Sequence, residues 1–89
     1  MAQHILTTGE VQEITPQNGA FFKLHELNEF VGGYIELVYL SDNRLMVVNE
    51  EGKLMGLPVN IKATREVVMS GINDVIVGDV LICDDNQIL

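Results

Sequence analysis

The sequence predicts a small α+β domain: a mixed, mainly antiparallel sheet of about five or six short strands, with one clear helix and one short helix. Three observations predict this class. Short β-branched runs alternate with turn residues, and one segment has apolar residues at helical spacing. The strongest strand, at 34–40, is joined to the next strand by a four-residue link, which is too short to cross over to a parallel partner. The 89 residues are expected to form a single domain, 1–89.

The N-terminal segment predicts a pair of short strands. Residues 3–8 and 10–15 are rich in β-branched side chains, and residues 8–10 between them are typical of a turn. Residues 16–19, Pro-Gln-Asn-Gly, then interrupt the regular structure.

Residues 21–31 have the clearest helical pattern. Their apolar side chains recur at intervals of three or four: Phe21, Leu24, Leu27 and Val31. The charged residues, Glu26 among them, are expected largely on the opposite side. The pair Gly32-Gly33 should end the helix, because glycine accepts the positive φ of a C-terminal cap without a steric clash.

Residues 34–40 form the strongest predicted strand, since they combine aromatic and β-branched side chains. Successive side chains of a strand point to opposite faces, so Ile35, Leu37 and Tyr39 share one face. This set is wholly apolar and is expected to face the core.

A three-stranded meander is expected in the middle of the chain. Residues 41–44 form a turn, and residues 45–48 return as an antiparallel strand. Residues 49–52, Asn-Glu-Glu-Gly, are typical of a second hairpin turn, because Asn and Gly tolerate left-handed backbone conformations. Residues 53–55 would then form a third, short strand.

The C-terminal third predicts a short helix and a last long strand. Asn60 is a suitable cap for a helix over residues 61–70, with Gly71 at its end. Residues 75–83 form a strong strand pattern interrupted at Gly78-Asp79, which indicates a bulge or a close backbone approach. Residues 84–86 are expected to turn, and residues 87–89 to add a short edge.

The charge balance limits the classes of partner that the chain is expected to bind. Thirteen acidic residues stand against five basic ones, a formal net charge of −8, and no basic stripe is present. This argues against direct nucleic-acid binding and against docking on an anionic membrane. The apolar runs are shorter than a bilayer span, and the N-terminus lacks a signal-peptide pattern, so a cytoplasmic location is expected. The surplus of acidic residues is expected mainly to keep the protein soluble. Basic proteins or cations are the classes of partner that remain.

The chemistry-bearing residues do not form a recognisable catalytic or metal-binding motif. His4, His25 and Cys83 are scattered, so we expect no metal and no cofactor. Cys83 ends an apolar strand, where a free cysteine usually acts as a small buried hydrophobe. Glu50 and Glu51 are adjacent on a turn and should diverge into solvent. The chain is therefore expected not to be an enzyme, with catalysis by Cys83 or by the Glu50/Glu51 pair as the alternative.

One polar set is a candidate ligand-binding site. Asn49, Glu50, Asn60 and Arg65 flank two connections that are expected at one end of the sheet. Turn chemistry explains Asn49 and capping explains Asn60, but loops over a rigid sheet commonly carry binding residues.

Four segments carry a resemblance to a known family. They are VGGYIE at 31–36, NEEGKL at 49–54, LPVN at 57–60 with Ala63, and IVGDVLI at 76–82. In this order they resemble a domain-of-unknown-function family found in bacterial phages, plasmids and conjugative elements. The resemblance implies a mobile-element context and implies no catalytic residue.

The leading hypothesis is a non-enzymatic accessory protein that binds a small ligand or a host protein. A narrower version is a counter-defence protein that sequesters a signalling nucleotide. An alternative is an acidic mimic that blocks a basic DNA-binding protein, although the acids are dispersed along the chain. An exposed sheet edge can pair with another copy of the chain, so a homodimer or higher homo-oligomer is also compatible with the predicted fold.

Overall fold

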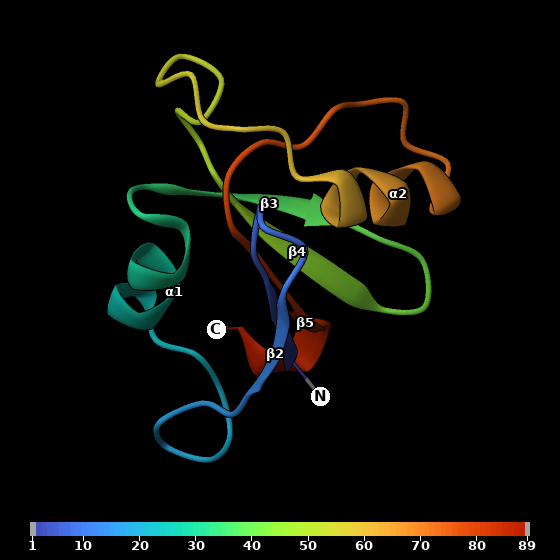
Figure 1. Ribbon diagram of the computed structural model, residues 1–89. Helices are drawn as coiled ribbons and strands as arrows, with labels where there is room; N and C mark the ends of the chain where they lie inside the picture. The colour runs from blue at the N-terminus through green and yellow to red at the C-terminus, as the bar shows by residue number, and fades with distance from the viewer. Residues whose placement is uncertain (1, 89) are drawn as a thin grey trace.

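The computed structural model describes residues 2–88, and within them the chain folds as the predicted α+β class (Figure 1). Five strands form one open sheet in the order β2-β1-β5-β4-β3, and every pair of neighbours is antiparallel. The strands are β1 (Ala2–Ile5), β2 (Val11–Ile14), β3 (Ile35–Tyr39), β4 (Arg44–Asn49) and β5 (Val80–Asp84). The helices are α1 (Leu24–Val31), α2 (Ile61–Met69) and the short 3-10 helix η1 (Asp85–Gln87). None of these helices is long and apolar enough to cross a membrane.

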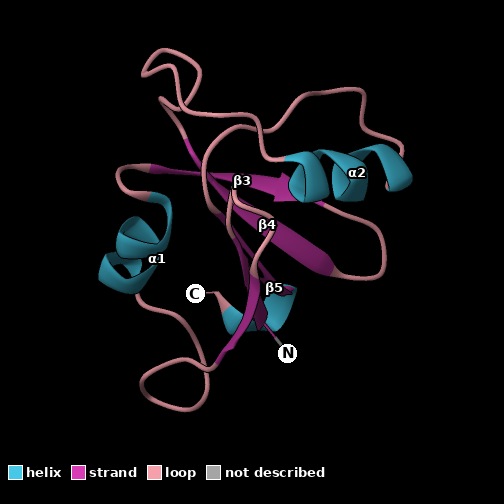
Figure 2. Ribbon diagram, viewed as in Figure 1, coloured by secondary structure: helices cyan, strands magenta, loops and turns pink. Residues whose placement is uncertain are grey.

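The two α-helices cover opposite faces of the sheet (Figure 2). The α1 face buries one cluster: Ala2, Phe22, Leu27, Val31, Val47, Leu81 and Cys83. The α2 face buries the other: Ile5, Leu40, Met46, Val48, Ala63, Val67, Ile76, Val80 and Ile82. The central strands β4 and β5 supply both clusters with alternate side chains, which is why their sequences are almost continuously apolar.

Because helices cover both faces of the sheet, the expectation that residues 34–40 bury only one face is wrong. Ile35 and Leu37 pack on the α1 side as predicted, but Tyr39 is 70% exposed. Val38 and Leu40 alternate with this set and so lie on the face that was expected to be outside the core, but both pack into the α2-side cluster. The error arose because a strand covered on both faces does not have one buried and one solvated side.

The predicted third strand at residues 53–55 is wrong. Residues 51–56 form successive turns, with hydrogen bonds from Met55 N to Glu51 O (2.9 Å) and from Gly56 N to Lys53 O (3.2 Å). β5 pairs with β4 instead. The reason is burial, because β5 is buried along nearly all of its length whereas Leu54 is 89% exposed.

The α1 helix begins three residues later than the apolar spacing predicted. Phe22 is held outside the helix by a hydrogen bond from its N–H to Gln87 O (2.6 Å) and by an isolated bridge to Ile88. This single bridge replaces the short edge predicted at residues 87–89, of which Leu89 lies outside the described residues. The helix ends at Gly32 with φ 78°, as predicted.

Glu26 was expected on the polar side of α1, but it is buried. Its carboxylate accepts hydrogen bonds from Lys23 N (2.7 Å) and Gln17 N (2.9 Å) at the start of the helix. These backbone hydrogen bonds, first that of Lys23, lower the pKa of the Glu26 carboxyl. A carboxylate here also offsets the exposed N–H groups of the first turn.

The α2 helix and the close approach at Gly78 follow the sequence prediction. Asn60 precedes the helix and accepts a hydrogen bond from Ala63 N. Gly78 has φ +79°, and a Cβ there would lie 2.8 Å from Leu57 Cδ1. The long strand predicted over 75–83 is broken at this glycine, so that only Val80–Asp84 joins the sheet.

Candidate functional site

The structure divides the four predicted ligand-binding residues into two separate pairs. Asn49 and Glu50 line one surface hollow, and Asn60 and Arg65 line another. The set therefore does not converge on a single ligand. Its role in binding stays a prediction for each pair.

Asn49 has a structural role at the end of β4. Its side-chain amide donates to Val31 O (3.1 Å), and its Oδ1 accepts from Glu51 N (2.8 Å). A Cβ on Gly33 would lie 3.1 Å from Asn49 Nδ2, so glycine is suited to that position. The asparagine thus joins β4 to the C-terminal end of α1.

Asn60 is fully buried, and its side chain is fully engaged. Nδ2 donates to Ile5 O (3.0 Å) and to Gly78 O (2.9 Å), and Oδ1 accepts from Ala63 N (3.1 Å). One residue therefore connects β1, α2 and the 74–79 segment. Burial without a free polar group favours a structural role over ligand binding.

The first surface feature is the acidic hollow, about 250 Å³, on the α2 face of the sheet. It is lined by Glu36, Val38, Val48, Asn49, Glu50, Lys53, Leu54, Asp74, Val75, Ile76 and Val77. Figure 1 shows that the yellow segment after β4 and the orange segment after α2 lie on the same side of the sheet. Three carboxylates and one ammonium group border this hollow, so its charge is acidic.

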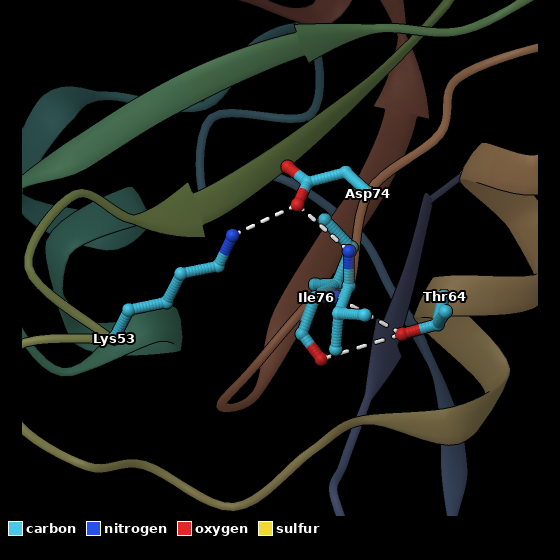
Figure 3. A network of polar contacts seen from close by, with 5 residues as sticks. Lys53, Thr64, Asp74 and Ile76 are labelled. Atoms are coloured by element: carbon cyan, nitrogen blue, oxygen red, sulfur yellow. Dashed lines mark hydrogen bonds and ion pairs between the residues drawn. The ribbon is translucent and has the colours of Figure 1, made fainter.

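An ion pair joins the two irregular segments across the acidic hollow (Figure 3). Lys53 Nζ lies 2.8 Å from Asp74 Oδ1, and the same oxygen accepts a hydrogen bond from Val75 N (2.7 Å). The hydrogen bond from Lys53 is the main cause that lowers the pKa of Asp74. Asp74 is thus ionised and neutralised by Lys53, and Glu36 and Glu50 carry the remaining charge.

The side of the acidic hollow that is formed by the 74–77 segment is bonded to α2. Thr64 Oγ1 accepts from Ile76 N (3.0 Å) and donates to Ile76 O (3.4 Å), as Figure 3 shows. The 74–77 segment has no strand of its own, and this double contact holds its backbone in place. The hollow is therefore bordered by a fixed wall.

A second feature, the apolar groove, lies on the α1 face of the sheet. The edge strand β3 borders both features, the acidic hollow with one face and the apolar groove with the other. The volume of the groove is about 340 Å³. It is lined by Phe22, Lys23, Leu24, Leu27, Ile35, Leu37 and Ile88. Leu24, predicted to face the core, is 63% exposed at its rim. Apolar surface left open in this way commonly marks an interaction site.

A third feature, the basic hollow, lies beside the start of α2 and has a volume of about 230 Å³. It is lined by Leu6, Thr7, Thr8, Gly9, Asn60, Ile61, Lys62 and Arg65. Neither Lys62 nor Arg65 makes an ion pair with any residue in the described part of the chain. Two cations are thus placed together on a protein of net charge −8.

The residues proposed for catalysis are not assembled into a site. Cys83 is fully buried, whereas His25 is exposed. Burial, with the neighbouring Asp84 carboxylate, raises the pKa of the Cys83 thiol to about 11. Glu50 and Glu51 are both exposed. A thiol with this pKa is protonated at neutral pH and is a poor nucleophile.

The histidines and acids also form no metal-binding group over residues 2–88. His4 lies against Phe30, with ring centroids 4.9 Å apart, and its Nε2 is 3.0 Å from Phe30 O. The ring thus serves packing between β1 and α1.

The sequence did not reveal most of the acidic hollow. Lys53 and Asp74 are 21 residues apart in irregular segments, so no periodic pattern links them. Lys53 and Leu54 directly follow the Asn49–Gly52 turn, where the sequence predicts a strand rather than the exposed loop that the structure shows.

The fold is that of a small α+β domain with an antiparallel sheet covered on both faces, and the acidic hollow and the apolar groove both border the edge strand β3. The profile of the family DUF3846, described as a domain of unknown function, matches residues 4–88. The chain therefore belongs to this family. Neither the curated proteins nor the solved structures contain a significant match.

Proposed function

We propose that the chain is a non-catalytic binding protein that recognises another protein through the acidic hollow. The observation that carries this proposal is the exposed apolar rim of that hollow. Leu54 and Val75 line the hollow and are 89% and 48% exposed, and Met55, the next residue after Leu54 in the sequence, is 57% exposed. Large apolar side chains held in solvent next to a concave surface are typical of protein contacts.

The charges around the acidic hollow support a basic partner. Glu36 and Glu50 remain after Lys53 neutralises Asp74. A protein segment with apolar side chains and neighbouring Lys or Arg residues complements this surface. The phosphates of a nucleotide would instead meet an excess of carboxylates, so a nucleotide fits the acidic hollow poorly.

The cellular role we propose is that of a mobile-element accessory protein acting on a basic host protein in the cytoplasm. The mobile-element context rests on the sequence resemblance and the basic partner on the charge. If the partner is a DNA-binding protein, the chain should compete with DNA for it at low salt, because screening weakens such contacts.

The first experiment is a random-peptide display selection on the purified protein. Enriched peptides should combine apolar and basic residues, and they should lose binding to the Glu36→Lys/Glu50→Lys double variant. The matched control is Glu10→Lys/Glu13→Lys, which makes the same charge change at exposed positions near β2. Peptides that bind both double variants equally well, or a selection without enrichment, would refute the proposal.

A second candidate function is binding of an anionic small ligand, such as a signalling nucleotide, in the basic hollow. The observation in its favour is the pairing of Lys62 with Arg65 beside the start of α2. Binding of a panel of cyclic and linear nucleotides should then be saturable, and a Lys62→Ala/Arg65→Ala variant should lose it. A panel without any binding would exclude this candidate.

A further inference from the structure

One edge of the sheet is open along β3. β3 is the last strand in the sheet order, and β4 is its strand partner within residues 2–88. Glu50 N donates to Tyr34 O (2.9 Å), and Leu40 N donates to Arg44 O (2.9 Å). Because the backbone of an antiparallel strand alternates, every second residue from Tyr34 to Leu40 directs its N–H and C=O toward β4.

The intervening residues Ile35, Leu37 and Tyr39 therefore direct their N–H and C=O groups away from the sheet. These groups make no backbone hydrogen bond to any residue that the structure describes. Such a row of donors and acceptors is a template for pairing with another strand.

The open edge runs between the two surface features that β3 itself helps to line. Glu36 and Val38 border the acidic hollow on the α2 face. Ile35 and Leu37 border the apolar groove on the α1 face. The side chains of a strand added to β3 would alternate between these two faces.

We infer that the β3 edge binds an extended segment of a partner protein, in which apolar residues alternate with Lys or Arg. Its backbone pairs with Ile35, Leu37 and Tyr39. Its apolar side chains enter the apolar groove, and its basic side chains lie beside Glu36 and Glu50. This inference rests on the proposed protein-binding function and specifies how the partner binds, by strand addition.

A second copy of the chain complements the edge less well. Each copy has a net charge of −8, so two copies would repel each other. Antiparallel pairing of β3 with itself about Leu37 would also place Glu36 of one copy opposite Val38 of the other, beside the acidic hollow. The other edge strand, β2, lines none of the three hollows, so the two edges are not equivalent.

The probe is a blocked peptide of about seven residues in which Lys and Val alternate, a length that spans the edge strand. A peptide of alternating Glu and Val is its control, since it keeps the pattern and reverses the charge. The Lys-Val peptide should bind at low salt, and the Glu-Val peptide should not. The Glu36→Lys variant should weaken binding, and the matched Glu13→Lys variant on β2 should not.

Amide hydrogen exchange followed by NMR reports strand addition directly. In the free protein, the amides of Ile35, Leu37 and Tyr39 should exchange fast, while those of Glu36 and Val38 are protected by pairing with β4. Saturating Lys-Val peptide should slow the first set by about tenfold or more and leave the second set little changed.

The Tyr39→Pro variant separates backbone pairing from side-chain contact. Proline removes a donor that points away from β4, so the sheet keeps its hydrogen bonds, as edge strands permit. Peptide affinity should fall about fivefold to tenfold, the effect of losing an interfacial hydrogen bond and of the added ring. The control Tyr39→Ala keeps the N–H and removes the exposed ring, and it should change affinity less than about twofold.

The outcomes distinguish this inference from the function on which it rests. Peptide binding that depends on Glu36 but ignores Tyr39→Pro, without amide protection, would overturn strand addition and leave protein binding intact. A Lys-Val peptide that does not bind would also overturn it, while the display selection judges the proposed function separately. Protection of Ile35 and Leu37 in the peptide-free protein, with a dimer that Tyr39→Pro dissociates, would assign the edge to a second copy.

Discussion

At the residue scale, Asn60 is a fully buried polar side chain whose three hydrogen bonds connect separate parts of the fold. Replacing it with Ala would leave Ile5 O, Gly78 O and Ala63 N without their side-chain partner. We predict a loss of about 3 kcal/mol in the free energy of unfolding, from a lost cap and buried unpaired groups. Urea denaturation measures it, with Asn73→Ala at an exposed position as the control. A loss no larger than that of the control would contradict the structural role.

Glu26 makes a pH-dependent contribution to stability. Its pKa is lowered in the folded protein by the hydrogen bonds from Lys23 N and Gln17 N. A carboxyl with a lowered folded pKa stabilises the fold above its unfolded pKa, and this contribution is lost as pH falls through the folded value. Glu26→Gln should therefore be less stable than the parent at pH 7, and the difference should shrink once the pH falls below the ordinary value of 4.5.

Denaturant unfolding over a pH series tests this behaviour of Glu26. Glu29→Gln, on an exposed position of the same helix, is the control and should differ little from the parent at any pH. A stability difference for Glu26→Gln that stays constant down to acidic pH would show that the carboxylate is not the source.

At the scale of elements, Gly78 determines where the last strand begins. An Ala there would have to keep φ near +79° and would place its Cβ 2.8 Å from Leu57 Cδ1. We predict a loss of about 1–2 kcal/mol from the left-handed backbone alone, with the contact adding to it. Gly71→Ala is the control, because its φ is +85° and no atom lies within 4 Å of the added Cβ. Equal losses in thermal or urea unfolding would mean that Leu57 moves aside without cost.

The sequence predicted those elements whose signals are local. The helix predicted over 21–31, which the structure shows as Leu24–Val31, and the β3–β4 hairpin follow from apolar spacing and turn residues, and the Asn60 cap follows from its residue type. The false strand at 53–55 had a plausible hairpin turn before it, but the partner of β4 is set by burial of the distant strand β5. Such competition between strands is not visible in a local pattern.

The candidate site was less accessible to prediction for the same reason. Asn49 and Asn60 were singled out by type, and the structure assigns both of them hydrogen bonds within the fold. The acidic hollow depends instead on Lys53 meeting Asp74 between two irregular segments. Irregular segments are placed by tertiary contacts, here those of Ile76 with Thr64, and these have no periodic signature.

At the scale of the whole molecule, the same charge should act in opposite directions on folding and on binding. The net charge of −8 brings like charges together when the chain folds, so salt should stabilise the folded state by screening them. Raising NaCl from about 20 mM to about 500 mM should increase the midpoint of urea unfolding modestly. Over the same range, the affinity for the Lys-Val peptide should fall, because the attraction between its lysines and Glu36 and Glu50 is screened. A peptide affinity that does not change with salt would mean that the apolar groove alone accounts for binding, and the acidic hollow would then have no part in recognition.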